Sequence, residues 1–277
     1  MSPAAQLLEG LLQALDVPGT GVRPLHAVLL VFARVAPLTV LGPLFLLRPA
    51  PPIVRAGVAL LLTLALSPLA LAHASLVFAP HELPLLLVVE ALRGLLFALA
   101  IALPVMALEG AGQWLDALRG AQNGGSAGPL FGGQVTPLGT LLGMLAVALF
   151  FAFGGHRVAL AAFATGFELV PVGAPLPSEA WPALAERSMR WVAAALALTV
   201  SVGAPTALAL VLSELTLGLM GRTAPQLPLH FAGMPLRAAL GVVGLLLTLG
   251  VLLPHLPELF MSGVDQGGAV LSQTHAP

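Results

Sequence analysis

The residues best suited to chemistry in this chain are charged side chains that lie inside long apolar segments. Four stand out on this ground: Arg34, Glu90, Arg93 and Glu214. If these segments cross a bilayer, a charge near its centre costs at least about 2.5–3.5 kcal/mol, so each group must face protein or water. Glu90 and Arg93 are three residues apart on one helix face, which predicts that they pair with each other.

Arg34 and Glu214 have no oppositely charged neighbour at helical spacing. Each must therefore find a partner on another segment or on another chain. Two interpretations stay open. The two charges can mark the ion path of a secondary transporter, or they can be assembly contacts in an oligomer. We favour assembly contacts, because the same segments contain many helix-breaking residues.

A second chemical motif lies at residues 124–128, which read Gly-Gly-Ser-Ala-Gly and match G-x-S-x-G. In hydrolases this pattern presents the serine on a sharp turn between a strand and a helix. Here the neighbouring segments are helical and the stretch is glycine-rich, so we do not expect Ser126 to be a nucleophile. The chain has no cysteine, and its seven histidines include no pair at i, i+4 spacing. We therefore predict no catalytic residue, no metal site and no cofactor.

The composition indicates an all-α integral membrane protein. Of the 277 residues, 58% are hydrophobic and only 8% are charged, whereas a soluble domain has about 25% charged residues. Disordered chains are poor in apolar residues, which excludes that class. A net charge of −1 gives no general attraction to nucleic acid, which normally needs a basic surface.

Seven apolar segments are candidates for the helices that position these residues. They run over about 25–47, 53–79, 83–110, 138–153, 158–170, 191–220 and 236–261. The third continues as a more polar helix to Arg119, and the sixth follows a polar helical start at 178–190. A spanning helix needs about 20 apolar residues, so the fourth and fifth segments are short.

Proline lies inside or beside most of these segments. The positions are Pro37, Pro43, Pro68, Pro104, Pro205, Pro254 and Pro257. Each removes a backbone hydrogen bond and clashes with the preceding turn. Broken helices in a membrane are tolerated where they are buried in protein or line a water-filled path. The sequence therefore predicts helical hairpins broken by proline and glycine, with a functional or assembly reason for the breaks.

The chain shows no internal repeat and no linker, so we predict a single domain over 1–277. Residues 1–22 carry leucines at helical spacing between polar residues, which predicts a short amphipathic helix that lies at the bilayer surface or packs on a partner. Residues 25–262 form the predicted helical core. The small, polar residues 263–277 are expected to be a flexible tail.

The Gly-rich stretch at 120–133 is the most unusual part of the chain. It is neutral and contains Gln122, Asn123, Leu130 and Phe131. Glycine lacks a side chain and allows unusual backbone angles, so such a loop can lie in a pore and block it until something moves it aside. An ordinary exposed linker is the alternative.

Several phrases together resemble the FliR/SctT family. The most specific is residues 213–227, which end in Gly-Arg-Thr-Ala-Pro-Gln-Leu, followed by Phe-Ala-Gly-Met-Pro-Leu-Arg at 231–237. The early phrases Phe-Ala-Arg-Val-Ala-Pro at 32–37 and Pro-Ile-Val-Arg-Ala-Gly at 52–57 also fit. The resemblance covers about residues 25–262.

This resemblance implies a subunit of the type III secretion export apparatus. The family assembles with FliP/SctR-like and FliQ/SctS-like subunits into a helical export gate of the bacterial inner membrane, on which a FlhB/SctU-like protein docks. Its broken hairpins lie largely above the membrane plane. The gate passes unfolded secreted proteins, and energy is supplied elsewhere in the machine, so the subunit itself is expected to be non-enzymatic.

The resemblance also implies roles for particular residues. The loop at 120–133 would be a plug facing the channel. The turn with Arg222 and Gln226, together with Arg237, would belong to the part that packs on neighbouring subunits. Met-Pro-Leu-Arg at 234–237 looks more like the injectisome branch than the flagellar branch. The chain departs from the usual pattern of the family at two places. Residue 237 is Arg, where Lys is frequent in the family, and no acidic residue lies between Asp116 and Glu168.

Overall fold

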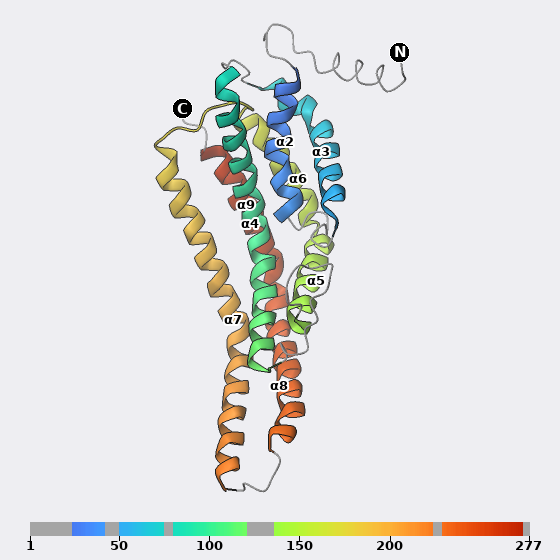
Figure 1. Cartoon of the computed structure of the whole chain (residues 1–277), viewed down its shortest axis with the longest axis vertical. Helices are drawn as coiled ribbons and strands as arrows, with labels where there is room; N and C mark the ends of the chain where they lie inside the picture. Colours follow the sequence, from blue (N-terminus) through green and yellow to red (C-terminus); the bar gives the residue numbers. More distant parts are fainter. Residues whose placement is uncertain (1–23, 42–49, 75–79, 121–135, 224–228, 274–277) are drawn as a thin grey trace. The chain divides into compact units, whose positions relative to one another are not determined.

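The structure, a computed structural model, describes residues 24–41, 50–74, 80–120, 136–223 and 229–273. In Figure 1 these residues form helices in the order α2 Pro24–Leu41, α3 Pro52–Ala72, η2 Pro80–Glu82, α4 Leu83–Leu118, α5 Pro137–Ala152, α6 Gly155–Leu169, α7 Ala180–Thr223, α8 Leu229–Leu252, η4 Leu253–His255 and α9 Leu256–Gln273. No strand occurs within these described ranges, and the predicted all-α class is confirmed.

Several of these helices are long and apolar enough to cross a membrane. They are Pro52–Ala72, Leu83–Leu118, Ala180–Thr223 and Gly233–Gly250, and the broken pair α5 and α6 passes the same test together. The chain is therefore a multi-pass membrane protein, as its composition predicted. The break between α5 and α6 is at Gly154, whose φ of +74° lies in the left-handed region that favours glycine.

The helices continue through more prolines than the sequence suggested. Pro37, Pro68, Pro104 and Pro205 all lie inside helices. Each ring removes a single donor, and α-helices in protein surroundings can absorb that loss locally. The break predicted near Pro254 is present as the 3-10 turn η4 between α8 and α9. Glycine at 154 and this turn therefore interrupt the helices, whereas the interior prolines leave them continuous.

The chain divides into two compact units. Unit 1 comprises 1–102, 154–188 and 262–277, and unit 2 comprises 103–153 and 189–261. The long helices α4 and α7, together with α9, contribute residues to both units.

Aromatic side chains of α4 and α6 form the centre of unit 1. The ring centroids of Phe97 and Phe163 are 5.1 Å apart, and those of Phe163 and Phe167 are 5.3 Å apart. A Cβ at Gly267 would lie 3.0 Å from the Phe97 ring, so α9 packs closely on this cluster. In the same unit α2 lies beside α3, which also contacts α6 (Figure 1).

The C-terminal residues depart from the expectation of a flexible tail over 263–277. Helix α9 continues to Gln273, and Val264, Val270 and Leu271 are buried. Glycines and small residues make this segment look like a loose tail in sequence, but here they allow close packing on unit 1. The amphipathic helix predicted at 1–22 lies outside the described residues.

Unit 2 has a separate aliphatic core, where the C-terminal part of α4 meets α5, α7 and α8. Its buried members are Leu115, Leu138, Leu142, Ala207, Leu210, Leu245 and Leu249. Trp114 packs against this cluster. Gly203 lies against the Trp114 ring, since a Cβ there would be 2.7 Å from it. This core positions the end of α4 and the start of α5.

Close approach of α2 to α4 provides a first prediction. A Cβ at Gly94 would lie 2.8 Å from the Arg34 carbonyl carbon, which is backbone and cannot swing aside. Gly94→Ala is therefore expected to lower the free energy of unfolding by about 1–3 kcal/mol, a typical cost of overpacking.

The matched control is Gly57→Ala in α3, where nothing lies within 4 Å of the added methyl group. It is expected to be neutral or to stabilise by up to about 1 kcal/mol, because alanine has the higher helix propensity. Thermal unfolding of the detergent-solubilised protein measures both. Equal unfolding temperatures for the two variants would contradict this account of the α2–α4 contact.

Candidate functional site

A buried carboxylate joins three parts of unit 1. Glu90 of α4 is fully buried, and its Oε2 accepts a hydrogen bond from Arg34 Nε of α2. Its Oε1 accepts from Arg93 Nη1 at 3.0 Å and from the backbone N–H of Gly173 at 3.0 Å. One side chain therefore links α2, α4 and the segment that follows α6. We call Arg34, Glu90 and Arg93 the buried charge network.

Both arginines also donate to backbone carbonyls. Arg34 Nη1 donates to Val170 O at 2.9 Å, and Arg93 Nη1 donates to Ala174 O at 2.8 Å. The Arg34 guanidinium also lies over the Phe167 ring, 4.8 Å from its centroid, where the negative face of the ring attracts the cation. Two guanidinium groups thus contact one carboxylate, and backbone carbonyls and a ring face also stabilise their positive charge.

This arrangement settles part of the sequence prediction. Glu90 and Arg93 pair as their spacing predicted. Arg34 finds its partner on another segment of the same chain, Glu90, rather than on Glu214. All three side chains are almost fully inaccessible, so the network is suited to fixing helices and not to contacting a diffusing substrate.

Glu214 has its own partner in unit 2. Its Oε1 lies 2.9 Å from Arg237 Nη2, which joins α7 to α8. The Glu214 side chain is 55% exposed and that of Arg237 is 20% exposed, so water screens this pair and it adds little stability. A shallow apolar hollow lies beside Glu214, lined by Leu118, Leu210, Val211 and Leu215.

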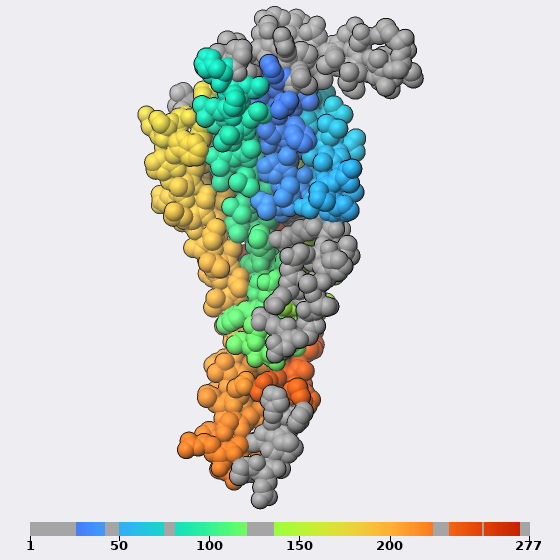
Figure 2. All heavy atoms as spheres, viewed as in Figure 1, coloured from blue at the N-terminus to red at the C-terminus, as the bar shows by residue number. Residues whose placement is uncertain are grey.

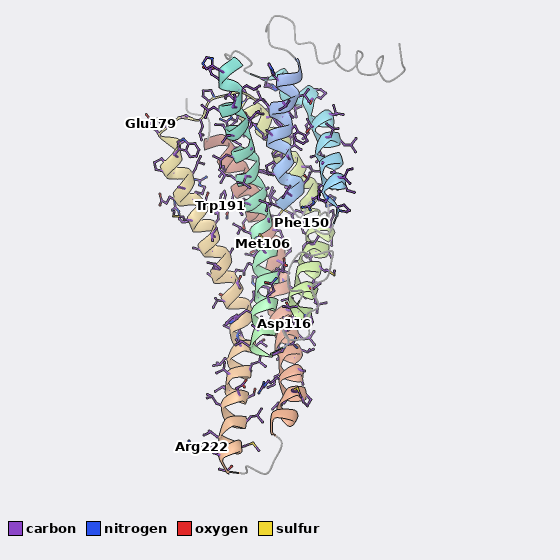
Figure 3. The ribbon with its side chains drawn as sticks, viewed as in Figure 1. Met106, Asp116, Phe150, Glu179, Trp191 and Arg222 are labelled. Carbon is purple, nitrogen blue, oxygen red and sulfur yellow. The ribbon has the colours of Figure 1, made fainter. Side chains whose placement is uncertain are left out.

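The other predicted site residues fall near or beyond the ends of described helices. Arg222 is exposed near the C-terminal end of α7 (Figure 3). Gln226 and the predicted plug residues Gln122, Asn123, Leu130 and Phe131 lie outside the described residues, as does Ser126. Within the described ranges no group of three or more His, Asp or Glu side chains is placed to hold a metal ion.

Asp116 is a buried functional group that the sequence reasoning did not single out. It lies near the C-terminal end of α4 (Figure 3). Its Oδ2 accepts from the backbone N–H of Leu138 at 2.6 Å and of Gly139 at 3.2 Å, while Oδ1 pairs with Arg119. The carboxylate therefore caps the first turn of α5 from another helix, where free N–H groups and the helix dipole favour an anion.

Two glycines bring these helices into contact around Asp116. A Cβ at Gly112 would lie 2.5 Å from Leu138 O, and one at Gly139 would lie 2.6 Å from Gln113 Cγ. Thr136, the N-cap residue of α5, makes no capping bond with its own side chain, because Asp116 supplies that acceptor. Since Gly120 and Thr136 border the residues 121–135, Asp116 holds both ends of that segment close together.

Two sequence features could have indicated this junction. Asp116 and Arg119 are at i, i+3 spacing at the end of an apolar helix, and the segment beginning Thr136-Pro137 is typical of a helix start. The pairing itself spans more than 20 residues of glycine-rich chain, so spacing alone does not reveal it.

The sequence of this chain is similar to a family of known proteins. Residues 25–263 match the sequence profile of bacterial export proteins, family 1. The chain is 28% identical over 247 residues to the flagellar biosynthetic protein FliR of Pectobacterium carotovorum subsp. carotovorum, covering 87% of this chain and 91% of that protein.

Relatives from secretion systems are similar at the same level. The chain is 28% identical over 185 residues to the Yop proteins translocation protein T of Yersinia pestis, covering 66% of this chain and 70% of that protein. It is also 28% identical over 170 residues to the secretion system apparatus protein SsaT of Salmonella typhimurium, covering 60% of this chain and 63% of that protein.

The buried charge network provides a second prediction. Glu90→Gln removes the carboxylate of the network and leaves the buried Arg34 guanidinium without the ion-pair partner that it has in the structure. Breaking a buried pair in this way is expected to cost about 3–5 kcal/mol of unfolding free energy. Thermal or denaturant unfolding in detergent measures the loss.

The control is Glu214→Gln, which removes one partner of the exposed pair with Arg237. It is expected to cost no more than about 1 kcal/mol, because exposed ion pairs contribute little. A Glu90→Gln protein as stable as the Glu214→Gln protein would show that the network does not hold unit 1 together.

Proposed function

The chain belongs to family 1 of the bacterial export proteins, the FliR/SctT family, and we propose that it is a subunit of their export gate. In this proposal it is a non-enzymatic, multi-pass protein of the bacterial inner membrane that helps to form the channel for unfolded substrates. The family match over residues 25–263 carries the proposal. Relatives named for flagellar biosynthesis and for translocation and secretion support it.

The length of α7 supports assembly with other proteins. Its 44 residues correspond to about 66 Å at 1.5 Å per residue, whereas the hydrocarbon core of a bilayer is about 30 Å thick. A helix of this length cannot lie wholly among acyl chains unless it is steeply tilted. Unless the helix is steeply tilted, part of its surface therefore lies outside the hydrocarbon core, against water or protein.

The exposed face of α7 is apolar along most of its length. Large side chains recur on it every three or four residues, except at Ala204: Met189, Val192, Leu196, Val200, Leu208, Val211, Leu215 and Leu219. We call these residues the α7 stripe. Positions 189–219 span about 45 Å at helical rise, half as long again as the hydrocarbon core. Apolar helices of partner subunits would cover such a stripe over its whole length.

We propose FliP/SctR-like and FliQ/SctS-like subunits as the partners of this face, with a FlhB/SctU-like protein docked on the assembly. Arg222, in the last turn of α7, and Gln226, which follows it in the sequence, are proposed subunit contacts together with the Glu214–Arg237 pair. Arg34, Glu90 and Arg93 serve assembly indirectly in this proposal, because they fix the helices of unit 1 that partners would meet.

The segment at 120–133 is the proposed channel plug, with Gln122, Asn123, Leu130 and Phe131 as its functional side chains. Asp116 supports this role, because it fixes the end of α4 against the start of α5 on either side of the segment. A plug must return to one place after each passage, and anchoring both of its ends serves that requirement.

We propose the injectisome branch as the setting, on the Met-Pro-Leu-Arg phrase at 234–237. The relatives include flagellar and secretion-system proteins at equal identity. The transporter alternative was based on Arg34 and Glu214, two intramembrane charges without a local partner. It is less favoured, because each of them pairs with a different residue of this chain.

Assembly is tested by co-purification. When the tagged chain is expressed with the two small membrane subunits of its own secretion locus, we expect all three to elute from detergent as one complex. Replacing Leu208 and Leu215 by glutamine should reduce the yield of complex tenfold or more. Each buried leucine contributes about 1.5–3 kcal/mol, and 1.4 kcal/mol is a factor of ten.

The control for this experiment replaces an exposed polar residue beside the stripe, Thr216→Gln, and should leave the yield unchanged. Recovery of the wild-type chain as a monomer that takes up solute alone in liposomes would refute the gate proposal. Such a result would favour a transporter.

The plug is tested separately by passive leakage. Apolar side chains in a narrow passage exclude water and ions, so Leu130→Ala with Phe131→Ala should raise ion leakage through the reconstituted complex. Gln122→Ala with Asn123→Ala is the control and should change leakage less. The measurement is conductance of the complex in a planar bilayer. Unchanged conductance in the first variant would contradict a plug at these residues.

A further inference from the structure

The last turn of α4 meets the middle of α8 at a single arginine. Arg119 directly follows α4, and its backbone N–H donates to Leu115 O at 3.0 Å, so it still belongs to the last helical turn. Gly120, whose φ is +70°, has the left-handed conformation that commonly ends a helix. In Figure 2 the green end of α4 borders the orange-red surface of α8, within unit 2. The helix therefore fixes Arg119 at the point where α4 reaches α8.

Gly241 of α8 provides the space that the Arg119 side chain occupies. A Cβ at this position would meet Arg119 Cδ and would lie 3.0 Å from Nε and 3.2 Å from Nη1. Arg119 Nε has no hydrogen-bond partner among the described residues, so packing holds this part of the side chain against α8. Gly241 lies on the buried face of α8 with Leu245 and Leu249, which belong to the core of unit 2. Any side chain at 241 would push the guanidinium away.

The Arg119 side chain in turn supports Asp116. Arg119 Nη2 donates to Asp116 Oδ1, while Asp116 Oδ2 accepts from the backbone N–H groups of Leu138 and Gly139 at the start of α5. The Asp116 side chain is fully buried and that of Arg119 is only 10% exposed, so solvent ions screen this pair weakly. Because a buried carboxylate without a cation is costly, Arg119 stabilises Asp116 at the place where it caps α5.

These contacts connect three helices in series. They run from the α8 backbone at Gly241 to the Arg119 guanidinium, then to the Asp116 carboxylate and the first amides of α5. We propose that Arg119 is a positioning residue: its packing against α8 holds Asp116 in place, and the position of α8 thereby sets the separation between the end of α4 and the start of α5.

The inference deepens the proposed function and rests on it in one respect. Residues 120 and 136 border the segment that contains the proposed plug side chains, so the same separation would determine how firmly that segment is anchored. Loss of the Arg119 packing should therefore also raise ion leakage through the reconstituted complex. The separation itself depends only on described residues of unit 2 and is measured independently of any partner.

The separation can be measured directly, because the chain has no cysteine. Ala117→Cys and Leu141→Cys place spin labels at exposed positions of α4 and α5 on either side of the junction. Pulsed electron spin resonance on the full chain in detergent gives the distances between the two labels. Without further substitution the distribution should be narrow. Gly241→Ala should widen it several-fold, because the added methyl group displaces Arg119.

The matched control is Gly250→Ala in the same helix, where nothing lies within 4 Å of the added methyl group. It should leave the distribution narrow. Arg119→Lys retains a long cationic side chain for Asp116 and should also remain close to the unsubstituted distribution, whereas Arg119→Ala should widen it.

A double variant shows whether Gly241→Ala acts through Arg119. Arg119→Ala removes the side chain that the new methyl group would meet, so adding Gly241→Ala to it should cause no further widening. If Arg119→Ala does not fold, Gly241→Ala tests the proposal by itself, since it adds one methyl group and leaves both charged residues in the chain.

Two results would overturn the role of Arg119: an unchanged distribution in Gly241→Ala, or a further widening when that substitution is added to Arg119→Ala. Failure of the plug proposal gives a different result, in which the label distances respond to Gly241→Ala but the conductance of the complex does not rise. In the converse case Leu130→Ala with Phe131→Ala raises the conductance while the label distances do not respond, and the plug stands without the Arg119 contact.

Discussion

Unit 1 depends on one buried carboxylate. Glu90 is the meeting point of α2, α4 and the segment after α6, and each of its neighbours is costly to bury alone. An isolated charge removed from water loses several kcal/mol of solvation. Two guanidiniums, a backbone N–H, several carbonyls and the Phe167 ring share that cost among them. The carboxylate therefore ties α2 and α4 to the segment after α6 through charged groups that are costly to bury apart.

The same reasoning explains which parts of the site the sequence could predict. The Glu90–Arg93 pair follows from helical periodicity, because side chains three residues apart share a face. The partner of Arg34 does not follow, since it lies 56 residues away and depends on how α2 packs on α4. Asp116 could not be predicted either, because its partners are backbone amides of another helix that lies more than 20 residues away in sequence. Helix class and approximate bounds were predictable from apolar runs, whereas α9 was not, because its glycines suggest a loose tail until their packing partners are known.

Glycine has a packing role in both units of this chain. Gly94 receives the Arg34 backbone in unit 1, and Gly112 and Gly139 bring α4 onto α5 in unit 2. In each case a close backbone approach lies next to a buried charge, Glu90 or Asp116. Helices that lack a hydrophobic driving force in lipid associate through such contacts and through hydrogen bonds. Glycine at these three positions thus serves the polar junctions, since a Cβ there would separate the groups that neutralise each other.

The exposed helices of this chain differ in how their length compares with the hydrocarbon thickness of a bilayer. A helix whose length matches the hydrocarbon thickness, such as the 21 residues of α3, can be covered by lipid along its whole length. A helix that exceeds this thickness twofold exposes apolar area that lipid cannot reach, as α7 does with its 44 residues. Since exposed apolar surface in water is unfavourable by about 25 cal/mol per Å², α7 gains most from association with other chains. Each unit has its own buried core, whereas the described residues leave the α7 stripe exposed, and this contrast is the physical reason for proposing that the protein is one part of a larger assembly.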